Sequence, residues 1–271
     1  MLICGRFEFA LERPLVMGIV NATPDSFSDG GRHADPARAI AHGLRLREAG
    51  ADILDIGGES TRPGAAPVDA AEELRRVLPV IEGLRDCGAA LSIDSMKPGV
   101  MAAALAAGAD MVNDVNALRA PGALDAVANA RCAVCLMHMQ GTPATMQQAP
   151  RYDDVVAEVR DFLRARIDAA RAAGIAPARL VCDPGFGFGK TSAHNRALFQ
   201  ALPQLAELAP VLVGLSRKSL FGGSGGRPVA GAAASVAAAA LAVARGAAIV
   251  RAHGVAETVE ALAVAHRLLG R

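Results

Sequence analysis

The sequence lacks an excess of charge of either sign. Its 271 residues include 28 Lys and Arg against 27 Asp and Glu, which leaves a net charge of +1. A chain balanced in this way has no overall field to hold nucleic acid or an anionic membrane surface, so neither is expected as a partner. Any anionic ligand must therefore be held by cations placed at particular positions.

Long apolar runs and a cysteine framework are also lacking. Arg6 and Glu8 interrupt the N-terminal stretch. The most uniformly apolar run, residues 231–244, is mostly alanine and is shorter than the roughly 20 residues of a membrane span. The five cysteines are odd in number and follow no framework spacing. Cys132 and Cys135 form a nominal CxxC, but residues three apart along a strand point to opposite faces, so we expect buried thiols. We therefore expect a reduced, cytoplasmic protein.

Metal-binding and nucleotide-binding motifs are missing from the sequence as well. It has no HExxH motif and no paired Cys/His cluster, so a zinc site is not expected. The glycine-rich segment 183–191 is not a phosphate loop, because Pro184 stands where that motif needs glycine. It is not a dinucleotide fingerprint either, because Lys190 stands where that motif needs its third glycine. We interpret it as a strand followed by a turn that exposes Phe186 and Phe188 to a flat ring.

What the sequence does contain is a regular alternation of short apolar runs and Ala-rich stretches. The apolar runs predict parallel strands covered by helices, at 15–20, 53–56, 91–93, 111–112, 132–137, 180–182, 211–215 and 249–250. The predicted helices lie at 36–49, 70–86, 98–107, 122–129, 153–173, 195–208, 231–245 and 255–269. This alternation predicts one domain over 1–271, an α/β fold of the (β/α)8 TIM-barrel type, with an open doubly wound sheet as the alternative. Residues 3–11 predict a short N-terminal β-hairpin.

Polar residues close the predicted strands. They are Asn21, Asp55, Asp94, Asn113, His138, Asp183, Ser216 and His253. Polar residues mark strand ends in general, which would explain any one of them. All of them together would surround one rim of a barrel, and in this fold that rim is the catalytic one. Long connections at 22–35, 57–69 and 217–230 suggest binding loops at the same rim.

The strand ends provide groups that suit a heterocycle with amide and amino substituents. The carboxylates of Asp94 and Asp183 can accept hydrogen bonds from ring N–H and exocyclic amine groups, while Asn113 can both donate and accept. Lys218 can add a donor to a ring carbonyl or nitrogen. Each of these residues could instead cap a strand or form a structural ion pair.

A second group of strand-end residues suits a phosphate. Arg62, Arg251 and His253 follow the second and eighth predicted strands, and the guanidinium fork matches phosphate oxygens. The alternative for these cations is an ion pair at the barrel rim. Asn21 together with a substrate pyrophosphate could hold Mg²⁺, an ion that commonly needs few protein ligands.

Several multi-residue segments, taken together and in order, resemble the dihydropteroate synthase family. They are 16–31 (VMGIVNATPDSFSDGG), 52–64 (DILDIGGESTRPG), 92–95 (SIDS), 113–115 (NDV), 137–142 (MHMQGT), 183–190 (DPGFGFGK), 216–219 (SRKS) and 251–253 (RAH). The resemblance covers nearly the whole chain, and so many matches in register are far more specific than any single one. It implies an enzyme that condenses 6-hydroxymethyl-7,8-dihydropterin pyrophosphate with p-aminobenzoate, giving 7,8-dihydropteroate and pyrophosphate in folate biosynthesis.

The resemblance also implies roles for individual residues. The pterin would be held by Asp94, Asn113, Met139, Asp183 and Lys218. The pyrophosphate and its Mg²⁺ cofactor would be bound by Asn21, Arg62, Arg251 and His253, with Asn21 as the metal ligand. The p-aminobenzoate site would be lined by Phe27, Thr61, Pro63, Phe188 and Ser219. The implied catalytic residues are Asp94, Lys218, Arg251 and His253, and the implied assembly is a homodimer.

Two departures from the family pattern stand out. The family usually has Asp where this chain has Gly254, but glycine also serves as a helix N-cap, so we expect altered local charge rather than lost activity. Residues 222–230 lack the charged residues usual after the SRKS segment.

Two other functions remain as alternatives at this point. A methyltetrahydrofolate-dependent methyltransferase has a similar pterin pocket but would not need Phe27, the Thr61–Pro63 loop or Arg251. A catalytically silent pterin-binding paralogue would be indicated by the loss of Arg62 or Asp94, and both are present.

Overall fold

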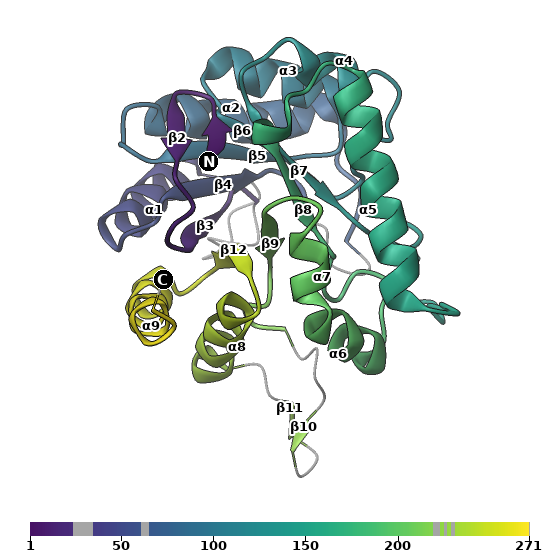
Figure 1. Ribbon diagram of the computed structural model, residues 1–271. Coiled ribbons are helices and arrows are strands. Elements are labelled where there is room, and N and C mark those ends of the chain that lie inside the picture. The colour runs from purple at the N-terminus through teal and green to yellow at the C-terminus, as the bar shows by residue number, and fades with distance from the viewer. Residues whose placement is uncertain (24–34, 61–64, 219–222, 225–226, 229–230, 271) are drawn as a thin grey trace.

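The computed structural model describes residues 1–23, 35–60, 65–218, 223–224, 227–228 and 231–270 (Figure 1). Within them, parallel strands close into a barrel in the order β12-β3-β4-β5-β6-β7-β8-β9. The strands are β3 (Leu15–Asn21), β4 (Ile53–Gly57), β5 (Ala90–Asp94), β6 (Met111–Asp114), β7 (Ala133–Met137), β8 (Leu180–Asp183), β9 (Val211–Val213) and β12 (Ala247–Ala252). The fold prediction is confirmed.

Helices surround the barrel, as Figure 1 shows. They are α1 (Pro36–Glu48), α2 (Ala70–Leu84), α3 (Pro98–Ala107), α4 (Ala123–Ala128), α5 (Val155–Ala172), the 3₁₀ helix η2 (Pro177–Arg179), α6 (Ser192–Gln200), α7 (Leu202–Ala206), α8 (Ala232–Ala244) and α9 (Val255–Leu268). No helix in the described ranges is long and apolar enough to cross a membrane. Short antiparallel hairpins pair β1 (Leu2–Cys4) with β2 (Phe7–Phe9), as predicted, and β10 (Gly223–Ser224) with β11 (Arg227–Pro228).

Most boundaries differ from the prediction by a few residues, and two differences change the interpretation. The single helix expected over 195–208 is divided into α6 and α7, because Pro203 has no N–H to continue the helical hydrogen bonds. Asp55 does not close its strand, because Ile56 and Gly57 continue the parallel ladder beside Ile93 and Asp94. The Asp55 side chain therefore lies inside the barrel rather than in a loop.

Alternation along the strands divides the apolar core into two layers. Ile53 and Ile249 face the barrel interior, whereas Leu54 and Val250 pack under the helices. The two cysteines of the nominal CxxC follow the same rule, with Cys132 in the helical layer and Cys135 in the interior. Both are free and buried, so the expectation of plain thiols is confirmed.

The N-terminal hairpin closes the amino end of the barrel, where Leu2 and Cys4 join the interior cluster. Asp110, which precedes β6, holds the hairpin there. Its carboxylate accepts hydrogen bonds from the backbone N–H and the guanidinium of Arg6 and from the backbone N–H of Leu91. The approach is close enough to require glycine at position 5, where φ is +56° and an added Cβ would lie 2.3 Å from the Asp110 Oδ1.

Candidate active site

The carboxyl ends of the strands bring most of the predicted site residues onto one rim. Parallel register sets Asp94 of β5 beside Asn113 of β6 and beside Gly57 of β4. Asn21 ends β3 next to the same Gly57, and Asp183 ends β8 beside Met137. Since carboxyl ends of parallel strands meet at one edge, residues distant in sequence become neighbours here.

Arg251 of β12 connects two carboxylates of this rim. Its Nε donates to Asp55 Oδ2 at 2.6 Å and its Nη2 donates to Asp94 Oδ2 at 2.8 Å. Asn113 Nδ2 donates to the same Asp55 oxygen at 3.0 Å. The four side chains therefore form one continuous network, and Asp55, to which the sequence reading gave no specific role, stands at its centre.

Burial shapes the charges of this network. It raises the pKa of Asp94 to about 7, and the charge of Asp55 adds to the effect while Arg251 opposes it. Burial acts to lower the pKa of Arg251, but the carboxylates of Asp55 and Asp94 outweigh it, so that pKa is raised. Burial and the charge of Asp55 therefore outweigh the Arg251 cation and bring the pKa of Asp94 close to neutral pH.

A second group of polar residues lies at the ends of β8 and β9. Asp183 Oδ1 accepts from the backbone N–H of Gly185 at 2.7 Å, and Lys218 Nζ donates to the carbonyl of Phe186 at 2.7 Å. The Lys218 ammonium also lies 4.9 Å from the ring centroid of Phe188. Burial raises the pKa of Asp183 and lowers the pKa of Lys218 to about 8, a shift that the charge of Asp183 opposes.

His253 follows β12 and is oriented by Ser216. The Ser216 hydroxyl accepts from the His253 backbone N–H at 3.3 Å and lies 3.0 Å from Nδ1 of the same residue. The hydroxyl can donate to Nδ1, and in that tautomer the ring proton lies on Nε2. The next residue, Gly254, is the N-cap of α9, as expected from its sequence position. An N–H donor and a helix N-terminus together suit an anion.

An apolar surface adjoins these polar groups. Met139, predicted to contact the ring, is 4% exposed and clusters with Val115, Met137 and Met146, while Met96 and Phe188 pack against the cluster. The expectation that both phenylalanines of the glycine-rich turn are exposed is wrong for Phe186. That side chain is buried in the helical layer, where its ring centroid lies 6.2 Å from that of Phe199 on α6. Only Phe188, which is half-buried, remains at the rim.

Part of the predicted site falls outside the described residues. These positions are Phe27, Thr61, Arg62, Pro63 and Ser219. Within the described ranges, no group of three or more His, Cys, Asp or Glu side chains could hold a metal ion.

The sequence reading missed a second residue, Lys190. Its side chain is 4% exposed and makes polar contacts with His138 and with the glycine-rich turn. Most of its acceptors are backbone carbonyls, which the sequence does not distinguish from those of any other residue.

Known proteins resemble this chain in sequence and in structure over nearly its whole length. The family described as pterin binding enzyme matches residues 17–253. A dihydropteroate synthase of Neisseria meningitidis serogroup C is 52% identical over 265 residues, covering 95% of this chain and 94% of its own. A Burkholderia cenocepacia dihydropteroate synthase solved with 7,8-dihydropteroate is 53% identical, with a TM-score of 0.90, covering 99% of this chain and 96% of its own. A Xanthomonas albilineans dihydropteroate synthase solved with 4-aminobenzoic acid is 58% identical, with a TM-score of 0.88 and coverages of 96% and 95%.

Proposed function

This chain belongs to the pterin binding enzyme family as one of its dihydropteroate synthases, and from that premise we propose how its residues share the reaction. The enzyme is a transferase of folate biosynthesis that joins 6-hydroxymethyl-7,8-dihydropterin pyrophosphate to p-aminobenzoate and releases 7,8-dihydropteroate and pyrophosphate. The observation that carries the residue assignment is the buried network of Asp55, Asp94, Asn113 and Arg251.

The pterin ring is held by the polar groups of the rim. Asp94 and Asp183 accept hydrogen bonds from its N–H and amine groups, Asn113 donates and accepts, and Lys218 donates to a ring acceptor. Met139 packs against the face of the ring. Asn113 and Asp183 are buried and Asp94 and Lys218 are half-buried, which supports the assignment because an electrostatic contact is stronger where water is largely excluded.

The pyrophosphate departs before the new bond forms. Cleavage of the bond from the methylene carbon to oxygen leaves a resonance-stabilised cationic pterin, whose charge the Asp94 carboxylate stabilises. Arg251 and the Nε2–H of His253 stabilise the departing anion, with Arg62 in the same role. The aryl amine of p-aminobenzoate then attacks the methylene carbon and releases a proton to solvent. No strong base is needed, because an aniline nitrogen is already nucleophilic at neutral pH.

The p-aminobenzoate site is proposed to be lined by Phe188 together with Phe27, Thr61, Pro63 and Ser219. The half-buried Phe188 ring and the Met139 cluster offer an apolar surface beside the methylene position. A flat aryl ring suits such a surface.

Mg²⁺ is the proposed cofactor. The half-buried Asn21 side chain at the end of β3 provides an amide oxygen, a ligand type that Mg²⁺ accepts when substrate phosphates and waters complete its shell. When bound, the ion would neutralise negative charge on the pyrophosphate. The side chains of the rim orient the pterin and stabilise its positive charge. A reducing, cytoplasmic compartment is proposed because the five cysteines are free thiols.

A pyrophosphate-release assay with and without p-aminobenzoate tests this function. We expect release in both cases and dihydropteroate only when p-aminobenzoate is present. A catalytically silent pterin-binding paralogue would release none, and neither would a methyltetrahydrofolate-dependent methyltransferase.

The rate should depend on pH through two groups of the pterin site. We expect kcat/KM to rise as the Asp94 network loses a proton near pH 7, since the carboxylate is the active form, and to fall as Lys218 loses its proton near pH 8. Lys218→Arg should abolish the alkaline fall and keep the acid limb, because a guanidinium stays charged over this range. A pH profile of kcat/KM for both proteins is the measurement, and an unchanged alkaline limb in the variant would contradict it.

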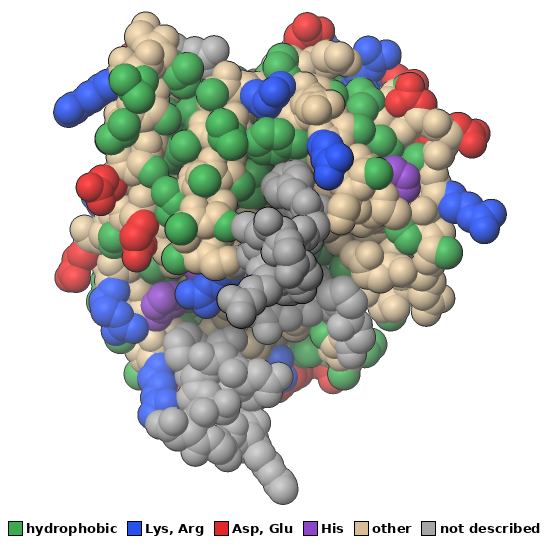
Figure 2. Space-filling model, turned by 90° about the horizontal axis from the view of Figure 1, so that it is seen from below, with side chains coloured by type: hydrophobic (Ala, Val, Ile, Leu, Met, Phe, Trp, Pro, Cys, Tyr) green, Lys and Arg blue, Asp and Glu red, His purple; other side chains and the backbone are tan. Residues whose placement is uncertain are grey.

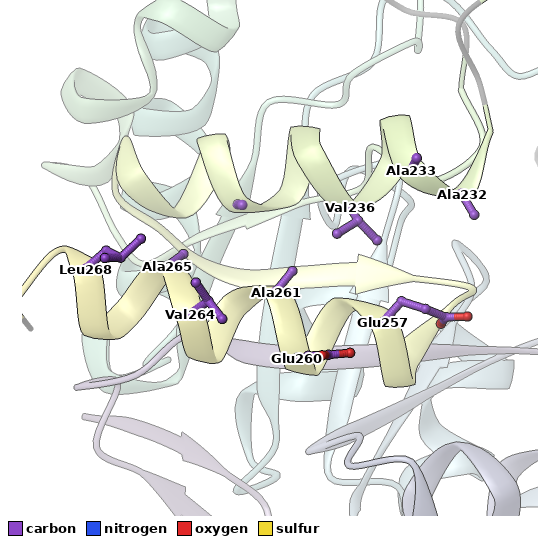
Figure 3. Close-up of a pocket in the computed structure, with 10 residues that line it drawn as sticks. Ala232, Ala233, Val236, Glu257, Glu260, Ala261, Val264, Ala265 and Leu268 are labelled. Atoms are coloured by element: carbon purple, nitrogen blue, oxygen red, sulfur yellow. The ribbon is translucent and has the colours of Figure 1, made fainter.

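A homodimer is proposed through the last two helices. Figure 3 shows α8 and α9 side by side, with a groove between them. Most of the side chains that line it are small or apolar, and two are carboxylates of α9: Ala232, Ala233, Val236, Ala240, Ala261, Val264, Ala265 and Leu268, with Glu257 and Glu260. The side of the molecule on which these helices lie carries a broad area of hydrophobic side chains (Figure 2). Leu241, Val264 and Leu268 are among the exposed large hydrophobic residues. A second copy fits this face, because a two-fold dimer buries the same surface on both subunits.

Disrupting this face should separate the subunits. Val264→Glu is expected to raise the dimer dissociation constant by about 100-fold or more, because it places charge in the centre of an apolar contact. Sedimentation equilibrium is the measurement. Leu44→Glu, at another exposed leucine on α1, is the matched control and should leave the dimer intact. A monomeric wild-type protein would refute the proposal.

A further inference from the structure

Lysine is scarce in this chain and confined to one part of it. Of the 28 basic side chains, only three are lysines, at positions 97, 190 and 218, and all of them follow carboxyl ends of barrel strands. Lys218 belongs to the pterin site. Lys190 is the most enclosed of the three, at 4% exposure, and the reaction outlined above does not use it. A buried ammonium needs compensating acceptors, so its contacts indicate what it does.

The Lys190 ammonium lies among acceptors from two different segments. From the end of β7, it contacts His138 Nδ1 at 2.9 Å and the His138 carbonyl at 3.3 Å. From the β8–α6 turn, the carbonyl of Phe188 accepts at 2.9 Å and that of Gly185 at 3.0 Å. One side chain therefore connects the turn to the neighbouring strand.

His138 is suited to act as the acceptor at one end of this link. Burial lowers the pKa of His138 to about 3, and the charge of Lys190 adds to the effect, so the imidazole is neutral. The ring is held edge-on to Phe162, with centroids 4.9 Å apart. A neutral ring that accepts at Nδ1 keeps its proton on Nε2, and Lys190 thereby fixes the tautomer. Burial also lowers the pKa of Lys190 to about 7, which the charge of Asp183 opposes.

Side chains donate to every carbonyl of the turn. Residues 185–189 belong to no helix or strand, yet each of their five carbonyls accepts a hydrogen bond from a side chain. Lys190 donates to the carbonyls of Gly185 at 3.0 Å and Phe188 at 2.9 Å. The other donors are Lys218 to Phe186 at 2.7 Å, Gln147 to Gly187 at 2.6 Å and Tyr152 to Gly189 at 2.8 Å. Lys190 is the only residue that supplies two of these bonds.

The close approach of the turn to β7 leaves little freedom for alternative positions. At Gly185, where φ is +68°, an added Cβ would lie 1.9 Å from the His138 carbonyl. At Gly189, where φ is +64°, it would lie 2.8 Å from the carbonyl of Gln140. The ladder joins the two segments up to Asp183, where the His138 N–H donates to the Asp183 carbonyl at 3.0 Å, and beyond that point the Lys190 ammonium contacts both of them.

We propose that Lys190 is a positioning residue that fixes the β8–α6 turn against β7 and thereby sets the place of Phe188 and the affinity for p-aminobenzoate. This inference rests on the proposed function, in which Phe188 lines the p-aminobenzoate site. The Phe188 carbonyl is bonded directly to Lys190, and its ring lies under the Lys218 ammonium. Of the pterin-binding groups, Asp94 and Asn113 belong to other strands. Asp183 and Lys218 bond to the turn at Gly185 and Phe186, through contacts of their own that do not pass through Lys190.

Lys190→Met tests the proposal, because methionine keeps the length of the side chain and removes its donors. We expect the KM for p-aminobenzoate to rise roughly 10-fold, with kcat and the Kd of the pterin changing by less than about threefold. The dissociation constant of p-aminobenzoate, measured by calorimetry in the presence of pyrophosphate and the unreactive 6-hydroxymethylpterin, should rise with the KM.

Arg179→Met is the matched control. Arg179, which directly precedes β8, is also a buried cation, at 8% exposure. Its guanidinium donates to the carbonyls of Cys132, Ala128 and Val127 before β7, at the opposite end of the barrel. Both variants should lower the melting temperature. Only the Lys190 variant should change the KM for p-aminobenzoate, which separates positioning from a general loss of stability.

Several outcomes would overturn the proposal. A KM for p-aminobenzoate within twofold of wild type, or an equal loss of affinity for both substrates, would do so. If Lys190→Met does not fold, Lys190→Gln is the second variant, because its shorter side chain keeps two donors. We expect it to raise the KM for p-aminobenzoate about threefold, and an unchanged KM would overturn the proposal. Wild-type protein that neither releases pyrophosphate nor binds p-aminobenzoate would overturn the proposed function itself, which is a separate observation.

Discussion

Asp94→Asn should slow pyrophosphate release roughly 100- to 1000-fold, which is the size of effect seen when one preorganised charge-stabilising group is removed. The amide has the shape of the carboxylate and keeps one acceptor for the pterin. It lacks the negative charge that stabilises the cation formed as the pyrophosphate leaves. The substitution therefore acts on the transition state more than on the bound substrate, and the Kd of the pterin should change by less than about fivefold.

Single-turnover release of pyrophosphate without p-aminobenzoate is the measurement, paired with calorimetric binding of a pterin that lacks the pyrophosphate. Asp161→Asn, at an exposed carboxylate on α5, is the control and should leave both quantities unchanged. Equal losses of rate and of pterin affinity would show that Asp94 only binds the ring.

Asp110→Ala should lower the free energy of unfolding by about 2–4 kcal/mol, because two backbone N–H groups lose their acceptor and each such loss costs about 1–3 kcal/mol where the donor is buried. The side chain is 2% exposed, and its loss would leave the backbone N–H groups of Leu91 and Arg6 without their acceptor. Arg6→Ala should cost less, because its guanidinium is partly exposed and Asp110 would keep both backbone donors.

Urea denaturation followed by circular dichroism measures these differences. Asp161→Ala removes an exposed ion pair and should change the unfolding free energy by less than about 0.5 kcal/mol. A loss under about 1 kcal/mol for Asp110→Ala would mean that the hairpin contributes little to closing the barrel.

The arrangement of the barrel was predictable because its strands repeat one pattern. Short runs buried on both faces, followed by amphipathic helices, permit few architectures, and a barrel places all strand ends at one rim. That rule alone was enough to bring Asp94, Asn113 and Asp183 together. The long connections were predictable in the same way, since β4 ends at Gly57 and α2 begins only at Ala70.

The contacts within the site were less predictable, for reasons of register and backbone geometry. Asp55 was placed at a strand end, but the ladder continues past it to Gly57, and alternation from Ile53 directs its side chain into the barrel. The role of Lys190 depends on backbone carbonyls, which are present at every residue and leave no trace in the sequence. Phe186 was expected to be exposed because it lies in a turn, yet the turn directs it toward α6.

The confinement of lysine to the rim has a consequence for covalent labelling. An acylating reagent that modifies lysine side chains would find no target among the other 25 basic residues, all of which are arginines. Burial lowers the pKa of Lys218 to about 8, so in mildly alkaline buffer much of this amine is unprotonated and nucleophilic. Acylation of Lys218 and binding of the pterin would therefore compete for the same side chain. The extent of modification at Lys218 would report the fraction of enzyme that has ligand bound.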